Sequence, residues 1–227
     1  LTAEKTIILN QEQTHYLKNV VKYNTGDTLN CFDNKNGEFL CQITEIGKKN
    51  INITVLSKLQ DFSPCPNIWL LFAPLKKDKT DFVIEKATEL GCRKIIPTIT
   101  KYTITNNIKT ERYTAQSIEA AEQCRRTDLP EITLPQKLEE ILNSWDSSRP
   151  LYFMDETLQS RPFPEILAAE TSPKAALLIG PEGGFSPEEL ALLRNSPFTK
   201  GATLGPRILR AETAVAAALS CWQIFAG

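Results

Sequence analysis

The sequence predicts two domains, a small β domain followed by a larger α/β domain with a largely parallel sheet. Three observations predict this fold class. Short apolar runs separated by turn residues come first, two prolines within residues 61–67 then interrupt the pattern, and beyond them apolar runs alternate with helical spacing. The 227 residues, 41% of them hydrophobic, suffice for two packed cores. We therefore expect domains at residues 1–64 and 65–227.

The first domain reads as hairpin strands with one short helix. Strands are expected at 7–9, 29–32, 39–43 and 51–55, with turns at 33–37 and 47–50. Asn10 can cap the helix, in which Leu17, Val20 and Val21 fall on one face. A small β-barrel is the simplest way to close such a domain.

The second domain has four apolar runs typical of buried strands, at 68–73, 95–99, 151–154 and 175–179. Ser186, Pro187 and Glu189 form the pattern of a capping box, which predicts a helix start. Residues 214–219 are almost entirely small and apolar, so their helix is expected in a core or a subunit interface. The run is too short to span a bilayer.

Two glycine-bearing turns, at residues 178–186 and 204–213, are the most informative motifs. The first lies between the end of a predicted buried strand and a helix start, where open α/β sheets bind ligands. The second is followed by Arg207, Arg210 and Glu212. A tight turn and a structural arginine–glutamate pair are the alternative explanations. A nicotinamide oxidoreductase is excluded because its glycine-rich turn would follow the first strand, where Ala73 and Pro74 stand instead.

Composition limits the classes of partner. The formal charge of −1 means that any nucleic-acid site must be a local patch. The six cysteines form no Cys-x-x-Cys pair, and the single His15 does not complete a zinc motif, so no metal is expected. No signal segment or membrane span is recognisable, which predicts a cytoplasmic protein.

Five segments in order resemble one known family. They are 15–22 with the following Gly26 and Asp27, 76–91, 118–126, 179–184 and 204–214. Together they resemble the 16S ribosomal RNA uridine-N3 methyltransferases of the SPOUT class over nearly the whole chain. Two features depart from the family: the chain opens at Leu1 without the usual basic, aromatic segment, and Lys22 stands where arginine is more common.

The resemblance implies a trefoil-knotted SPOUT methyltransferase domain preceded by a PUA-like RNA-binding β-barrel. It implies S-adenosylmethionine as cofactor, 16S ribosomal RNA within the small ribosomal subunit as substrate, and a homodimer. It also implies the residues that contact the cofactor: Ile179, Gly180, Pro181, Glu182, Gly183, Gly184, Leu204, Gly205, Ile208, Leu209, Arg210 and Thr213.

Methylation at uridine N3 requires loss of the imide proton from an unpaired base. Arg210 is the candidate cation that stabilises the resulting anion. Glu182 or Glu212 could accept the proton or orient the base, and Glu182 could instead cap its own helix.

RNA contacts are expected from five basic side chains, although a solvated surface or a helix end would explain each of them equally. They are Lys22, Lys76, Lys79, Arg125 and Arg126. Two alternative functions keep the fold: a knotted methyltransferase acting on transfer RNA or another RNA, and a non-catalytic RNA-binding assembly factor.

Overall fold

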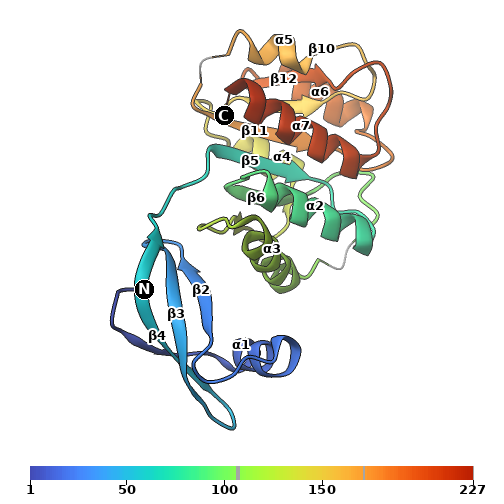
Figure 1. The fold of residues 1–227 in the computed structure, drawn as a ribbon. Coiled ribbons are helices and arrows are strands. Elements are labelled where there is room, and N and C mark those ends of the chain that lie inside the picture. The colour runs from blue at the N-terminus through green and yellow to red at the C-terminus, as the bar shows by residue number, and fades with distance from the viewer. Residues whose placement is uncertain (106–107, 171, 227) are drawn as a thin grey trace. The chain divides into compact units, whose positions relative to one another are not determined.

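The computed structural model describes residues 1–105, 108–170 and 172–226. The chain forms two compact units, Leu1–Pro64 and Cys65–Gly227 (Figure 1). Within the described residues, no helix combines the length and the apolar character needed to cross a membrane.

The N-terminal unit is a four-stranded antiparallel sheet in the order β1-β4-β3-β2. Its strands are β1 (Thr6–Ile8), β2 (Thr28–Asp33), β3 (Gly37–Ile46) and β4 (Ile51–Gln60). Alternate side chains of the two long strands, β3 and β4, are buried and form most of the core of this unit. This period-two burial is the pattern that predicted the strands.

The predicted helix in this unit starts as expected but does not continue as an α-helix. Asn10 caps α1 (Gln11–His15) and forms a capping box with Gln13. The chain then widens into the π-helix η1 (Tyr16–Val21). Leu17 is buried, whereas Val20 and Val21 are exposed. The prediction of one shared apolar face was wrong, because a π-helix does not keep the α-helical spacing on which it depended.

The C-terminal unit is built on a parallel sheet in the order β10-β12-β9-β11-β5-β6-β7, with β8 also paired to β6. Its four predicted strands are β5 (Asn67–Phe72), β6 (Lys94–Ile99), β9 (Leu151–Met154) and β11 (Lys174–Ile179). The sequence analysis missed β7 (Glu131–Ile132), β8 (Gln136–Lys137), β10 (Arg161–Pro162) and β12 (Thr199–Thr203). Three of these have only two residues, and β12 buries only Ala202 and Thr203.

Helices cover both faces of this sheet (Figure 1). One core contains side chains of α2 (Lys77–Glu89), α3 (Thr110–Cys124), α5 (Phe163–Leu167) and α7 (Ala211–Ala226). The other contains side chains of α4 (Leu138–Asn143) and α6 (Pro187–Asn195). Strand β5 shows the alternation, since Leu70 and Phe72 belong to the first core and Leu71 to the second.

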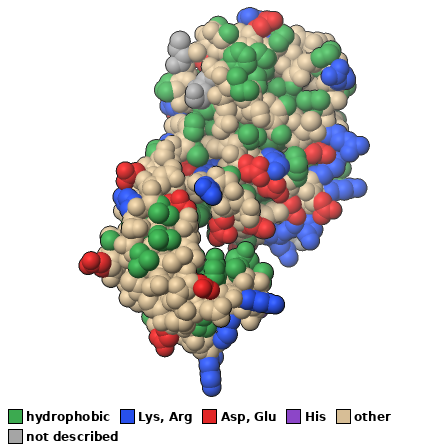
Figure 2. Space-filling view, viewed as in Figure 1, with side chains coloured by type: hydrophobic (Ala, Val, Ile, Leu, Met, Phe, Trp, Pro, Cys, Tyr) green, Lys and Arg blue, Asp and Glu red, His purple; other side chains and the backbone are tan. Residues whose placement is uncertain are grey.

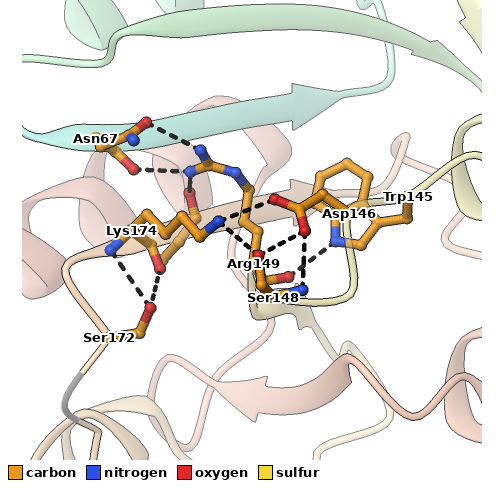
Figure 3. Close-up of polar contacts among 8 residues, drawn as sticks. Asn67, Trp145, Asp146, Ser148, Arg149, Ser172 and Lys174 are labelled. Carbon is orange, nitrogen blue, oxygen red and sulfur yellow. Dashed lines mark hydrogen bonds and ion pairs between the residues drawn. The ribbon is translucent and has the colours of Figure 1, made fainter.

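A polar network fixes the amino ends of the central strands (Figure 3). Arg149, just before β9, donates to the carbonyl oxygens of Asn67 at 2.9 Å and Ala175 at 3.0 Å. Lys174, at the start of β11, pairs with Asp146 at 2.9 Å. These contacts lie at the strand starts, so the carboxyl ends of the strands are left to form the ligand edge of the sheet.

Candidate functional site

The carboxyl ends of β9, β11 and β12 surround a pocket of about 410 Å³, which we call the glycine-turn pocket. Its walls come from the loops that follow these strands and from the start of α7. The lining residues are Met154, Asp155, Glu156, Leu158, Ile179, Gly180, Pro181, Glu182, Gly183, Gly184, Ala202, Leu204, Arg207, Ile208, Leu209, Arg210, Ala211 and Ala214.

The first glycine turn depends on the absence of a side chain at Gly184. This residue has a φ of +71°, and a Cβ placed there would lie 2.5 Å from Glu156 Oε1. The same Glu156 oxygen accepts a hydrogen bond of 2.9 Å from the backbone N–H of Phe185. Glycine therefore allows the turn to close against the loop after β9. The predicted capping box of Ser186 and Glu189 then opens α6.

The second glycine turn leads into α7. Gly205 has a φ of +110°, which favours glycine. Ile208 is 72% exposed, whereas Leu204 and Leu209 pack partly against the main core. The turn thus presents an apolar surface to the pocket without being buried within the core.

Most of the residues predicted to contact a cofactor line this one pocket, but two do not. Gly205 and Thr213 are absent from its lining, and Thr213 is exposed. On α7 the cavity lining includes Ala211 and Ala214, and a cofactor contact by the Thr213 hydroxyl stays a prediction. Glu212 also lies outside the lining.

Lys79, in the first turn of α2, joins the two candidate catalytic carboxylates. Its Nζ lies 3.0 Å from Glu182 Oε1 and 3.9 Å from Glu212 Oε1. The other carboxylate oxygen of Glu212 is buried and has no hydrogen-bond partner within the part of the chain that the structure describes. Sequence reasoning had assigned Lys79 to RNA, whereas the structure places it between two acids at the pocket edge.

The pKa of Glu182 lies below its ordinary value. Burial tends to raise that pKa, but the hydrogen bond from Lys79 and the charges of Lys79 and Lys76 outweigh it. Glu182 is therefore held as a carboxylate beside the pocket, able to accept a hydrogen bond or a proton. Arg210 lines the same pocket and is exposed.

The sequence analysis missed the contribution of the β9 loop. Asp155 is buried and accepts hydrogen bonds of 2.6 Å from the hydroxyls of Thr157 and Ser160. Burial tends to raise its pKa, but these hydrogen bonds and the charge of Arg194 keep the pKa below the ordinary value. A signal was present, because Asp155 and Glu156 directly follow a predicted strand, at the sheet edge where ligands bind.

The expected RNA contact at Arg126 is corrected by the structure. Arg126 is only 8% exposed, and its guanidinium donates to Asp128 and to the carbonyl oxygens of Thr88 and Cys92, at 2.7–2.8 Å. It therefore ties the end of α3 to the end of α2. The neighbouring Arg125 is exposed in the left-handed conformation.

The other basic candidates remain on the surface. Lys22 and Lys76 are exposed, and Lys22 has a left-handed conformation at the end of η1. On the face drawn in Figure 2, basic side chains of the C-terminal unit are interspersed with acidic ones. Within the described residues, no group of three or more His, Cys, Asp or Glu side chains is placed to hold a metal ion.

Comparison with known proteins gives the family. A family model for an RNA methyltransferase domain matches residues 63–223, and one for an RNA methyltransferase PUA domain matches residues 9–56. A Rickettsia conorii protein named ribosomal RNA small subunit methyltransferase E is 33% identical over 216 residues, which cover 95% of this chain and 88% of the relative. The Bacillus subtilis protein of the same name is 29% identical over 95% of this chain and 88% of its own.

Solved structures agree with this assignment. A ribosomal RNA small subunit methyltransferase E from Neisseria gonorrhoeae, bound to S-adenosyl methionine, has a TM-score of 0.88 at 26% identity and covers 99% of this chain and 93% of its own. A Legionella pneumophila protein solved with the cofactor SAM has the same TM-score and coverage at 30% identity. The chain belongs to the RNA methyltransferase family whose curated members are named ribosomal RNA small subunit methyltransferase E.

Proposed function

We propose that this protein transfers a methyl group from S-adenosylmethionine to N3 of a uridine in 16S ribosomal RNA. The observation that carries the proposal is the glycine-turn pocket, in which two glycine turns, an arginine and an ionised carboxylate meet at the carboxyl edge of a parallel sheet. The names of the relatives and the cofactor bound in the two solved structures support the same activity.

The pocket has the features that S-adenosylmethionine requires. The cofactor supplies an electrophilic methyl group on a sulfonium. Side chains would narrow the cavity at the first turn, since a Cβ at Gly180 would lie 3.1 Å from the ring of Phe185 and one at Gly184 would meet Glu156. The glycines keep main-chain groups accessible there. Leu204, Leu209 and Ala214 would give an apolar wall for the adenine and ribose.

The residues at the pocket edge match the needs of N3 methylation. Glu182 lines the pocket as a carboxylate, so we assign to it the acceptance of the imide proton. Glu212 does not line the pocket, and we assign to it the positioning of Lys79. Arg210 would stabilise the anion formed as the proton leaves. The target uridine must be unpaired from any RNA helix before its base can reach these groups.

The remaining roles follow from the family resemblance. We assign RNA binding to the PUA-like unit at residues 1–64 and methyl transfer to residues 65–227. Exposed Lys22, Lys76 and Arg125 are our candidates for phosphate contacts. The enzyme would act as a homodimer on the small ribosomal subunit in the cytoplasm. Ile224 and Phe225 of α7, 79% and 51% exposed, offer apolar surface for such a dimer.

The test is methyl transfer from radiolabelled S-adenosylmethionine to small-subunit particles, to naked 16S ribosomal RNA and to transfer RNA, followed by nucleoside analysis. We expect 3-methyluridine as the product. Another methylated nucleoside, or transfer only to transfer RNA, would contradict the proposed reaction. Cofactor binding without transfer to any of these RNAs would instead favour a non-catalytic assembly factor.

Arg210 variants check the same site. We expect Arg210→Ala to lower kcat by roughly 100-fold, the scale of losing one stabilising donor. Arg210→Lys keeps the charge and should recover part of the loss. Equal kcat in all three proteins would exclude Arg210 from the mechanism.

A further inference from the structure

A second hollow adjoins the glycine-turn pocket and has no role in the preceding argument. We call it the Tyr102 hollow. It is lined by Lys101, Tyr102, Thr103, Ile104 and Gly183. Gly183 lines both cavities, so a ligand in the Tyr102 hollow would lie next to whatever occupies the glycine-turn pocket.

The tyrosine is exposed and lies close to the first glycine turn. Tyr102 is 42% exposed, and its neighbour Ile104 is 70% exposed. A Cβ placed at Gly183 would lie 3.3 Å from Tyr102 Cβ, a contact tighter than most side chains make. The glycine therefore allows the aromatic residue to sit against the turn that carries Glu182.

The loop that carries Tyr102 is fixed from the α6 side. It follows β6, and the backbone N–H of Lys101 donates to Glu189 Oε1 at 2.8 Å. The side chain of Lys101 pairs with Glu188 at 3.1 Å. Both acids belong to the first turn of α6, so the loop is anchored to the helix that the first glycine turn opens.

Further contacts fix the loop internally and from the β5 side. The backbone N–H of Thr100 donates to the hydroxyl of Thr103 at 2.9 Å, and the hydroxyl of Thr105 donates to the carbonyl oxygen of Leu75 at 3.0 Å. Lys101 Nζ also lies 6.0 Å from the centre of the Tyr102 ring. Because these contacts fix the loop backbone, a planar ligand can bind the exposed ring with little ordering of the loop.

We propose that Tyr102 stacks on the target pyrimidine base once that base has left the RNA stack. This inference rests on the proposed function and adds the place where the substrate base binds. A flipped base exposes two π faces, and proteins commonly cover such faces with aromatic side chains. A base on Tyr102 would lie beside Gly183, the residue that follows Glu182, and so at the edge of the methyl-donor pocket.

Stacking positions a base but does not choose among bases, because every base has a π face. Tyr102 is therefore a positioning residue that would act on RNA binding and on the attack geometry. Choice of uridine is left to hydrogen-bonding groups such as Glu182.

The first test compares wild type with Tyr102→Ala and Tyr102→Phe in methyl transfer to 16S ribosomal RNA. We expect Tyr102→Ala to lower kcat/KM for RNA by roughly 10-fold or more, since stacking contributes about 1–3 kcal/mol per base. Its affinity for S-adenosylmethionine should stay within about twofold of wild type. Tyr102→Phe keeps the ring and should retain most of the activity.

Leu134→Ala is the matched control. Leu134 is 72% exposed, lies in the same unit and belongs to neither cavity lining, so its truncation removes exposed apolar surface without touching the proposed base site. A kcat/KM for Tyr102→Ala equal to that of wild type would overturn the inference and leave the proposed function standing. Absence of transfer by wild type would overturn both.

The second test locates the base directly. A 16S ribosomal RNA transcript containing 5-iodouridine, irradiated in complex with the protein, cross-links to aromatic side chains that stack on the modified base. We expect a cross-linked peptide containing residues 101–104, lost in Tyr102→Ala. Cross-links confined to the N-terminal unit would contradict the inference. This readout does not require methyl transfer, so it separates base binding from catalysis.

Discussion

Lys79 Nζ lies 3.0 Å from Glu182 Oε1, and this ion pair joins the first turn of α2 to the first glycine turn. The two residues are separated by 103 positions in the chain. Lys79 also approaches Glu212, so one cation faces two acids at the edge of the glycine-turn pocket. The pair keeps a carboxylate ionised beside a site where an anion is proposed to form.

Removal of Lys79 should move the pH dependence of the reaction. Lys79→Ala takes away the contacts that lower the pKa of Glu182, so that pKa rises. Because only the carboxylate accepts a proton, the acid limb of the kcat/KM profile should move to higher pH. We expect the loss of activity at acid pH and little change at neutral pH, where a carboxylate of ordinary pKa stays ionised, and Lys79→Arg should restore the limb. An unchanged profile in Lys79→Ala would exclude Glu182 as the group titrated in that limb.

Gly184→Ala should distort the first glycine turn and obstruct the pocket that it lines. The new methyl group would meet Glu156 Oε1 at 2.5 Å, and the residue would have to keep a φ of +71°. We expect loss of S-adenosylmethionine binding in calorimetry and destabilisation of about 1–3 kcal/mol. Gly26→Ala is the matched control, since Gly26 has a φ of +98° but nothing within 4 Å of the new carbon. Normal cofactor affinity in Gly184→Ala would contradict the placement of the cofactor at this turn.

Arg126 and Arg125 are adjacent but should respond in opposite ways. Arg126→Ala leaves Asp128 without its buried cationic partner and should cost about 3–5 kcal/mol of unfolding free energy in urea titrations. Arg125→Ala changes an exposed side chain and should alter stability by less than about 0.5 kcal/mol. If Arg125 contacts a phosphate, its removal lowers the slope of log affinity against log salt by about one. Equal stabilities for both variants would refute the structural role of Arg126.

Acid should weaken the C-terminal unit partly through Glu170. Hydrogen bonds from Lys200 and Tyr152 lower the pKa of Glu170 from 4.5 to about 2. A carboxylate with a lowered folded-state pKa stabilises the fold above pH 4.5, and this contribution is lost as pH falls towards 2. Glu170→Gln should therefore cost on the order of 2 kcal/mol at pH 7, after allowance for solvent screening, and less at pH 3.

The control for this pH dependence is Glu165→Gln, which changes an exposed acid in the neighbouring helix α5. Urea titrations between pH 7 and pH 3 measure both variants against wild type. Glu170→Gln and wild type should converge as the pH falls, whereas Glu165→Gln should follow wild type throughout. A constant difference between Glu170→Gln and wild type over this range would contradict the assigned pKa.

The sequence predicted those strands in which the local pattern of apolar residues corresponds to the side chains that are buried. Strands β5, β6, β9 and β11 are buried on both faces and read as apolar runs. Strand β12 does not form such a run, because it carries Thr, Lys and Gly and buries only Ala202 and Thr203. The trefoil knot that the family resemblance implies would leave no local pattern either, since periodicity reports only on neighbours in sequence.

In the candidate site, too, only the features with a local sequence pattern could be predicted. Glycine turns marked the pocket because unusual backbone conformations restrict the residue type. The partners of those turns come from distant segments, so neither the pairing of Lys79 with Glu182 nor the inward direction of Arg126 could be read from spacing. Clusters of basic residues predict a surface patch only when no buried acid or carbonyl competes for them, as Asp128 does for Arg126.

The position of β11 bears on how this protein is synthesised. β11 lies between β5 and β9, which are not paired to each other, so it alone joins the two halves of the sheet. Until a ribosome has translated residues 174–179, β5 and β9 therefore lack their common neighbour and each leaves an apolar strand edge unpaired. The same strand ends in the first glycine turn, and α7 closes the other side of the pocket. A nascent chain thus completes its central sheet and its glycine-turn pocket only after β11, β12 and the start of α7 have been made, long after the N-terminal unit.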